Sequence, residues 1–462
     1  MHYRDFIDEN RDNIIRDVQR LVRIKSVDDT PAEGMPFGQG IGEALNEALQ
    51  ISEELGFVTC NLDGYAGYAE AGEGEETVGI LVHMDVVPEG EGWSLAPYGG
   101  EVKDGKIYGR GTSDDKGPAV AALYALKAVV QSGAALNRRV RVIFGTNEEI
   151  SSKCMEYYIE KCGEVDTGFT PDANFPLIHG EKPILQGEIA FTDSKEATAP
   201  CLVEISGGKA ANMVADNCRA VLLVQVGQSF EEAFKAYCKK HVLKGIYKQE
   251  DAKHVLELSG ASSHGSRPQE GINAIAHMVE FLSALPLNRG SEFAKEYMEK
   301  IGLDTDGTKL GIAKKDEFGE TTLCVGTIRT ENGNFIVGVD VRYPLTLKDE
   351  ARALFAGALK EKNLVYEEKA YKAGLYMPLD SSLVKTLMKC YSEETGDSTT
   401  PAFTIGGGTY ARSMKNILGF GMVFPGEEEV MHKRDEYVQI DKLLTATKIY
   451  AAAIIALAAD EE

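Results

Sequence analysis

The sequence lacks three features that mark membrane, secreted or thiolate-metal proteins. No apolar run reaches membrane-spanning length, since the apolar stretch 451–460 is too short. The first 27 residues are charged and amphipathic, without the apolar core of a signal peptide. The eight cysteines are scattered and contain no CxxC pair, which is typical of structural thiols in a reducing compartment. We therefore expect a cytoplasmic protein.

Positive charge is also scarce. Lys and Arg number 49 against 72 Asp and Glu, which leaves a net charge of −23. Nucleic acid and anionic membrane surfaces would repel such a chain, so neither is expected as a partner. A small substrate is not excluded, because a local cationic pocket can lie within an acidic protein. With 462 residues and 43% apolar side chains, we expect a folded protein of two domains.

The first part of the chain alternates strand-like and helix-like segments. Buried strands are predicted at 77–83 and 139–145, with a helix over 117–133 between them and another helix after Glu149. This alternation predicts an α/β domain, a mostly parallel sheet with helices on both faces. Functional groups in such sheets collect beyond the carboxyl ends of the strands.

The pattern changes near residue 187, where strand-like segments dominate around a helix at about 270–285. We therefore predict an inserted α+β domain over 187–375, between two parts of the first domain at 1–186 and 376–462. In the second part, helices are expected at 382–395 and 442–459, with a strand at 419–426 between them.

Polar motifs follow the predicted strands. In LVHMDVVP, strand alternation places His83 and Asp85 on one face. In YGRGTSDDKGP, Asp114 immediately precedes a helix, where an ordinary helix cap is the alternative interpretation. In FGTNEEISS, Glu148 and Glu149 are adjacent carboxylates, which are usually a solvated surface pair. Here they directly follow an apolar strand, and this position makes a solvated pair less expected.

Two further motifs complete a set of possible metal ligands. GFTPDANFP carries Asp172 in a proline-flanked loop, and VFPGEEEVMHKRDE supplies His432. Imidazole and carboxylate ligands without cysteine suit zinc, manganese or cobalt. One metal needs about three protein ligands, so five or more candidates fit two metals that share a carboxylate.

Seven motifs, in order along the chain, resemble those of one enzyme family. HMD, GRGxxDxKG, NEE, PDxxFP, SSHGSRPxxGxNA, GGGTYAR and FPG…H resemble the two-metal, zinc-type peptidase family of aminoacylase, carnosinase and succinyl-diaminopimelate desuccinylase. The similarity runs from about residue 77 almost to the C-terminus. The GGGTYAR segment and the large middle domain are most similar to the PepV-type bacterial dipeptidases.

The resemblance implies two divalent metals, most simply Zn²⁺, with Mn²⁺ or Co²⁺ as alternatives. It makes Asp114 the carboxylate that bridges the two metals. His83 and Asp172 would complete the ligands of one metal, and Glu149 and His432 those of the other. It also makes Glu148 the general base and Asp85 the group that orients the imidazole of His83. Asp115 stands where the family often has an apolar residue, so either Asp114 or Asp115 could bridge, and spacing favours Asp114.

Substrate recognition is expected from the middle domain and the glycine loop. The resemblance makes His264 an oxyanion stabiliser. An arginine fork and loop amides suit a terminal carboxylate, which gives a set of candidate binding residues: Asn212, Arg342, Gly407, Gly408 and Thr409. The alternative for Arg342 is a salt bridge at the edge of a strand.

The leading hypothesis is a dipeptidase that acts on short peptides with a free C-terminal carboxylate. The alternatives are an N-acyl-amino-acid deacylase or desuccinylase with the same site, and a non-catalytic binding protein. A non-catalytic binding protein would be expected to lack a metal ligand or the general base, and here every one of those positions carries a suitable residue. The resemblance implies relatives whose smaller lid dimerises, and the middle domain here is long enough to hold two such units. We therefore expect it to act as a lid in a monomer that uses its own His264, as the resemblance also implies. The alternative is a dimer in which the extra length is peripheral.

Overall fold

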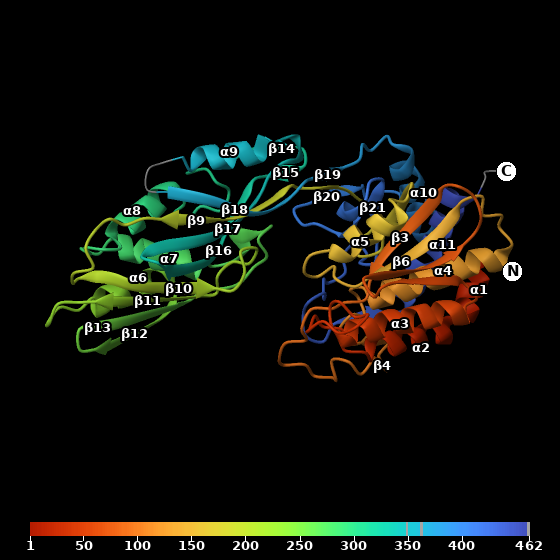
Figure 1. The fold of residues 1–462 in the computed structure, drawn as a ribbon, viewed down its shortest axis with the longest axis horizontal. Helices are drawn as coiled ribbons and strands as arrows, with labels where there is room; N and C mark the ends of the chain where they lie inside the picture. Colours follow the sequence, from red (N-terminus) through yellow and green to blue (C-terminus); the bar gives the residue numbers. More distant parts are fainter. Residues whose placement is uncertain (348–349, 361–363, 460–462) are drawn as a thin grey trace. The chain divides into compact units, whose positions relative to one another are not determined.

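A computed structural model describes residues 1–347, 350–360 and 364–459, and these form two compact units. Unit 1 contains residues 1–179 and 376–404 and the part of the chain after 407. Unit 2 contains residues 180–375 and the short segment 405–407 (Figure 1). The chain therefore leaves unit 1 twice, and the second excursion, of three residues, has no counterpart in the division expected from the sequence. Within the described residues, no helix has both the length and the apolar character needed to cross a membrane.

Unit 1 contains helices near both ends of the chain and strands between them. Its helices are α1 (Tyr3–Glu9), α2 (Arg11–Val22), α3 (Gln39–Glu54), α4 (Lys116–Ser132), α5 (Lys153–Cys162), α10 (Ser382–Thr395), the short η3 (Tyr410–Ser413) and α11 (Ile440–Ala458). Its strands are β1 (Val58–Leu62), β2 (Ala66–Ala71), β3 (Thr77–His83), β4 (Glu101–Lys103), β5 (Lys106–Tyr108), β6 (Arg139–Gly145), β7 (Thr167–Thr170), β20 (Phe403–Ile405), β21 (Ile417–Gly419) and β22 (Tyr437–Gln439). Strands β8 (Ile178–Glu181) and β19 (Leu375–Tyr376) span the first two of the four points where the chain passes between units, and β20 spans the third.

The main sheet of unit 1 has the order β1-β2-β6-β3-β7-β21-β8-β19, with β20 paired to β8. The four central strands, β6, β3, β7 and β21, pair in parallel. The pairs β1–β2, β2–β6 and β21–β8 are antiparallel. The α/β class predicted from the sequence is confirmed, and the parallel part of the sheet is its buried centre, as expected for strands covered on both faces.

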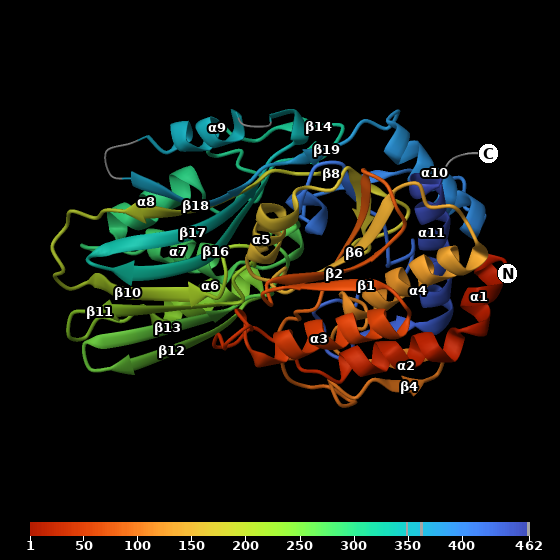
Figure 2. The ribbon, with the colours of Figure 1, turned by 45° about the vertical axis from the view of Figure 1, so that its right-hand side comes forward.

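Helices cover both faces of this sheet. The pleat of β6 turns Gly145 towards Cys154 of α5 and Tyr410 of η3. The opposite face turns Gly67 of β2 towards Leu45 and Leu49 of α3. Helices α4 and α11 lie beside each other against the central strands (Figures 1 and 2). The site-bearing centre of the sheet is thereby held between two layers of packed helices.

The predicted elements agree closely with the observed ones around the parallel strands. The observed β3 and β6 span the predicted ranges, and α4 begins one residue before the predicted helix. The strand predicted at 419–426 is wrong, because β21 covers only Ile417–Gly419. Gly421 then adopts a φ of 107°, and a side chain there would collide with Tyr450 and Phe175. A regular strand cannot continue through this conformation, which favours glycine.

Unit 2 is built on strands paired only with antiparallel neighbours. Its strands are β9 (Ile184–Phe191), β10 (Cys201–Gly208), β11 (Asn217–Leu223), β12 (Lys244–Glu250), β13 (Lys253–Ser259), β14 (Lys315–Asp316), β15 (Gly319–Glu320), β16 (Thr322–Glu331), β17 (Asn334–Arg342) and β18 (Leu364–Lys372). Its helices are α6 (Glu231–His241), η1 (Pro268–Glu270), α7 (Ala274–Ser283), α8 (Ser291–Lys300), η2 (Leu345–Leu347) and α9 (Glu350–Ala358).

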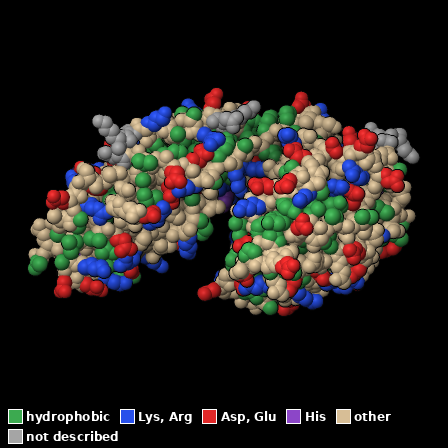
Figure 3. All heavy atoms as spheres, viewed as in Figure 1, with side chains coloured by type: hydrophobic (Ala, Val, Ile, Leu, Met, Phe, Trp, Pro, Cys, Tyr) green, Lys and Arg blue, Asp and Glu red, His purple; other side chains and the backbone are tan. Residues whose placement is uncertain are grey.

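The main sheet of unit 2 has the order β12-β13-β11-β10-β16-β17-β9-β18. Its core joins alternate strand residues such as Ile189 and Val337 to aromatic residues of the helices, including Phe281 and Phe293. Several strands, such as β18, alternate between more buried and more exposed positions, which fits a sheet with one solvated face. The visible surfaces of both units carry interspersed acidic and basic side chains (Figure 3).

Candidate active site

The ends of three parallel strands bring polar residues to one edge of the unit 1 sheet. Strand β3 ends at His83, β6 is followed by the Glu148–Glu149 pair, and β7 is followed by Asp172. Because β6, β3 and β7 are neighbours in that order, their carboxyl ends meet at the same place. The sheet thus assembles side chains that lie about 90 residues apart in sequence, such as His83 and Asp172.

Asp114 lies at the centre of this group. Its Oδ1 is 2.8 Å from Nε2 of His83, and its Oδ2 is 2.9 Å from Nε2 of His432. Asp114 and His83 are buried, whereas the side chain of His432 is 54% exposed. One carboxylate therefore contacts a different imidazole with each of its oxygens.

Two sets of ligand atoms share Asp114. The first is His83, Asp114 and Asp172, and the second is Asp114, Glu149 and His432. His83 Nε2 lies 4.0 Å from an oxygen of Asp172, and His432 Nε2 lies 3.3 Å from an oxygen of Glu149. Ligand atoms around a tetrahedral zinc ion are about 3.3 Å apart, given bonds of about 2.0 Å. The spacing and the nitrogen–oxygen donor set fit a divalent metal in each group.

The electrostatics of the group also fit bound cations. Burial and the nearby charge of Asp114 raise the pKa of Asp172 to about 7. Burial, followed by the charge of Asp172, raises the pKa of Glu148 well above its ordinary value, and burial and Asp114 raise that of Glu149. Four neighbouring carboxyl groups cannot all ionise cheaply in a dry site. Two dications would reverse this repulsion.

Asp85 has a different set of contacts from the one that the resemblance implies. Its two carboxylate oxygens accept hydrogen bonds from the backbone N–H groups of Glu148, at 3.1 Å, and Glu149, at 3.0 Å. Nδ1 of His83 lies 2.9 Å from the backbone carbonyl of Asp85 and 3.5 Å from the carboxylate. The Asp85 residue thus orients the imidazole mainly through its carbonyl, while its carboxylate fixes the two glutamates.

The structure separates Asp114 from Asp115. Asp115 is fully buried, and its Oδ2 accepts a hydrogen bond from the backbone N–H of His83 at 3.0 Å. Burial raises the pKa of Asp115 well above its ordinary value, and Asp115 belongs to neither ligand group found among the described residues. The helix-cap alternative for Asp114 also fails, because the residue that precedes α4 is Asp115 and its side chain makes no capping hydrogen bond.

Sequence reasoning missed Glu436, which holds the loop that carries Asp114. Its carboxylate is fully buried and accepts hydrogen bonds from the backbone N–H groups of Gly111, at 3.0 Å, and Ser113, at 2.9 Å. Its other oxygen pairs with the guanidinium of Arg110. The available signal was its position four residues after His432, in a motif that already carried a predicted ligand.

The GGGTYAR motif is divided between the units. Gly407 belongs to unit 2, and Gly408 and Thr409 belong to unit 1. The hydroxyl of Thr409 accepts a hydrogen bond from the N–H of Ala411 at the start of η3. The next residue, Tyr410, is buried against the edge of the His83 ring, with centroids 6.1 Å apart. Unlike the glycines, Tyr410 packs directly on a predicted ligand, and its place in the motif gave no sign of this contact.

The remaining predicted residues belong to unit 2. His264 is exposed, and its Nδ1 lies 2.7 Å from the hydroxyl of Ser266. The backbone carbonyl of Asn212 accepts a hydrogen bond from Gly265 at 2.7 Å, so Asn212 and His264 belong to one loop cluster.

Arg342 is 2% exposed and lies at the end of β17. Its Nε donates to Asp340 at 2.8 Å, and one terminal nitrogen donates to the backbone carbonyl of Gly406 at 2.6 Å. The ion pair considered as the structural alternative for Arg342 is therefore present. The same side chain also fastens the glycine segment 405–407.

The chain is similar to known proteins over most of its length. A family model described as "Peptidase family M20/M25/M40" matches residues 79–456. "Putative dipeptidase YtjP" of Bacillus subtilis is 39% identical over 457 residues, covering 97% of this chain and 98% of the relative.

Two crystal structures share the fold. Human carnosine dipeptidase 1 has a TM-score of 0.57 and 16% identity, covering 98% of each chain. The M20 family metallo-carboxypeptidase Sso-CP2 of Sulfolobus solfataricus also has a TM-score of 0.57 and 16% identity, covering 96% of this chain and 98% of its own. From the family match and the YtjP relative, the chain belongs to the peptidase family M20/M25/M40 and is a hydrolase that acts on peptide bonds.

Proposed function

We propose that the chain is a metal-dependent dipeptidase with two divalent metal ions, most simply Zn²⁺. The observation that carries the proposal is the carboxylate of Asp114, whose two oxygens contact His83 and His432 at 2.8 and 2.9 Å and so join two ligand groups. The name of the 39% identical Bacillus relative supports the dipeptidase assignment.

The proposed roles follow from the residues around these groups. Bound dications would polarise the substrate carbonyl and lower the pKa of the attacking water. Glu148 accepts the proton of that water and passes it to the leaving amine. Its absence from both ligand groups among the described residues supports this role, whereas Glu149 belongs to one of them. Asp85 holds the two glutamates in register through their backbone N–H groups.

We assign substrate recognition to residues of unit 2 and the glycine segment. His264 stabilises the developing oxyanion, and a binding set recognises the terminal carboxylate: Asn212, Arg342, Gly407, Gly408 and Thr409. A free carboxylate one residue beyond the cleaved bond is then required. Dipeptide amides and long peptides should be poor substrates.

The test is a substrate panel on metal-depleted and reloaded protein. Chelation should abolish cleavage of unmodified dipeptides, and Zn²⁺, Mn²⁺ or Co²⁺ should restore it. The panel compares dipeptides, their C-terminal amides, tripeptides and N-acyl amino acids. Faster turnover of N-acyl amino acids would identify a deacylase instead, and full activity in metal-free protein would overturn the metal assignment.

We further propose that the chain works as a monomer with its own His264. The length of unit 2, residues 180–375, supports this because one chain supplies a large recognition unit. Light scattering at assay concentration should give the mass of one chain. Mixing inactive His264→Ala and Glu148→Ala proteins should not restore activity. A dimer whose mixed variants regain activity would show that His264 acts across subunits.

A further inference from the structure

Unit 2 contains a second cluster of histidine and carboxylate side chains, which the proposed reaction does not use. His241, His277 and Glu280 each offer a ligand atom within 4.8 Å of the others. His241 is the last residue of α6, and His277 and Glu280 lie one turn apart on α7. The cluster lies wholly within unit 2.

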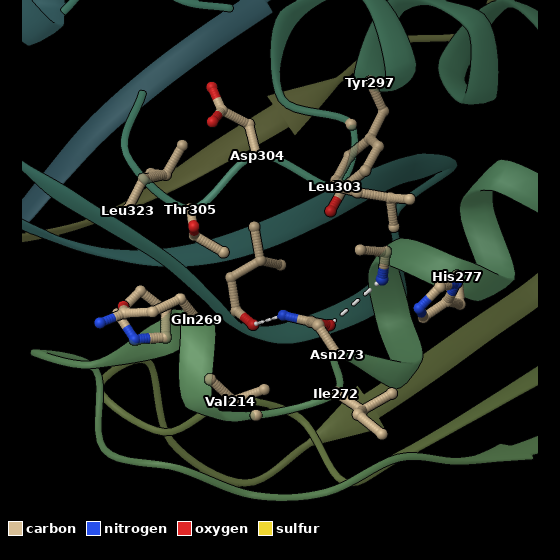
Figure 4. A pocket seen from close by; sticks show the side chains of 15 residues that line it. Val214, Gln269, Ile272, Asn273, His277, Tyr297, Leu303, Asp304, Thr305 and Leu323 are labelled. Carbon is tan, nitrogen blue, oxygen red and sulfur yellow. Dashed lines mark hydrogen bonds between the residues drawn. The ribbon is translucent and has the colours of Figure 1, made fainter. Parts of the chain in front are cut away.

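Helices α6 and α7 present these side chains on a preformed contact. The rings of Phe234 on α6 and Phe281 on α7 are 5.1 Å apart, and both side chains are buried in the core of unit 2. The two helices lie side by side in both ribbon views (Figures 1 and 2). The start of α7 is fixed as well, because Asn273 accepts from the N–H of Ile275 and Ala276 and donates to the carbonyl of Val325 (Figure 4).

Tyr237 organises two of the three side chains. Its hydroxyl lies 2.5 Å from an oxygen of Glu280 and 3.0 Å from Nδ1 of His277. It also stacks on the ring of His241, one turn further along α6, with centroids 4.4 Å apart. A hydrogen-bonded partner of this kind usually orients the ligands of a protein-bound metal.

The hydrogen bonds within the cluster do not account for the buried ring nitrogen of His241. Its Nε2 is buried and has no hydrogen-bond partner among the described residues. Buried polar atoms are almost always paired, so an orphan atom beside two other ligand groups indicates a missing partner. The His241 and His277 rings are 5.3 Å apart between centroids, which leaves room for an ion between them.

We propose that His241, His277 and Glu280 form a third metal site, which binds a divalent transition ion such as Zn²⁺ and ties α6 to α7. Two imidazoles and one carboxylate form a common three-ligand zinc set, and their nitrogen donors disfavour Mg²⁺ and Ca²⁺. His277 also borders a cavity of about 330 Å³ in unit 2, beside Asn273 and Ile272 (Figure 4). The site stabilises unit 2 and does not take part in peptide hydrolysis.

The experiment counts zinc in the full-length protein with the unit 1 site disabled. Asp114→Asn protein is stripped with a chelator, exposed to micromolar Zn²⁺, desalted and analysed for metal. His241→Gln is then added to the same background, and His2→Asn, at a histidine outside every cluster, is the matched control. We expect the His241→Gln change to remove one equivalent of zinc per chain and the His2→Asn change to remove none.

A second measurement separates a metal site from a polar cluster. Zn²⁺ should raise the thermal unfolding midpoint of Asp114→Asn protein, and this shift should vanish with His241→Gln. Equal zinc content with and without His241→Gln, or binding only at millimolar Zn²⁺, would overturn the proposal. If the His241→Gln variant fails to fold, the Asp114→Asn protein alone still tests the proposal. The absence of a zinc-dependent shift in its unfolding midpoint would contradict the site. Dipeptidase activity is not used, so a wrong function for unit 1 leaves the result interpretable.

Discussion

The two histidine–carboxylate clusters of this chain are built in different ways. The unit 1 cluster draws on the ends of three parallel strands and on distant loops, and crowds Asp114, Glu148, Glu149 and Asp172 together. The unit 2 cluster lies on two packed helices, contains one carboxylate and is partly buried. The first cluster crowds several carboxylates, whose repulsion bound cations would balance, whereas the single carboxylate of the second already accepts a hydrogen bond from Tyr237. A metal should therefore be essential for the first cluster and supportive for the second.

The largest expected effect comes from replacing the shared carboxylate. Asp114→Asn should reduce peptidase activity to background, because both ligand groups lose their common anionic member. Asp115→Asn is the matched control. Asp115 belongs to neither ligand group, and the amide oxygen of the variant can still accept the hydrogen bond from the backbone N–H of His83. Steady-state assays with metal analysis check both variants, and equal losses in the two would contradict the assignment of the bridge to Asp114.

The two adjacent glutamates should respond differently to the same change. Glu148→Gln should lower kcat by about 10²–10⁴-fold, the usual contribution of a positioned acid–base group, with metal content unchanged. Glu149→Gln should lose metal instead, because Glu149 belongs to a ligand group. Metal analysis beside kcat distinguishes them. If Glu148→Gln loses metal and regains full turnover when metal is resupplied, the two roles are exchanged.

A smaller effect is expected from the support of the Asp114 loop. Glu436→Gln should weaken metal affinity by about 10–100-fold, the usual range for a group that orients ligands. The charge that holds Arg110 and the N–H groups of residues 111 and 113 is lost. Competition with a chelator measures the affinity. Glu428→Gln, at an exposed position nearby, should leave it unchanged, and equal effects in the two would show that Glu436 has no special part.

The smallest effect on catalysis is expected from the unit 2 cluster. His241→Gln should leave kcat/KM for dipeptides unchanged while amide hydrogen exchange in α6 and α7 becomes faster in the presence of Zn²⁺ than in the unmodified protein. Exchange measured with and without Zn²⁺ provides the comparison. A loss of kcat/KM in folded His241→Gln protein would show that the unit 2 cluster contributes to peptide hydrolysis, contrary to the proposal.

Much of unit 1 could be predicted because its signals are local. An apolar run such as 77–83 reveals a buried strand, and the polar residues just beyond it mark the sheet edge. The contacts of Asp85 and Glu436 could not be predicted in this way. Their hydrogen bonds go to backbone N–H groups 63 to 325 residues away, and such partners leave no pattern in the sequence. The unit 2 cluster was missed for a related reason, because His241 and His277 lie 36 residues apart on separate helices that only tertiary packing brings together.

The position of β21 has a consequence for the way the chain is made. This strand, Ile417–Gly419, pairs with β7 inside the unit 1 sheet, and α11 at the end of the chain packs on the same sheet. During synthesis, β7 therefore lacks its partner strand β21 until all of unit 2 has been synthesised. Unit 2 consists mainly of one continuous segment with its own core, so it can fold first. The candidate ligand groups can therefore come together only after unit 2, β21 and His432 have been synthesised.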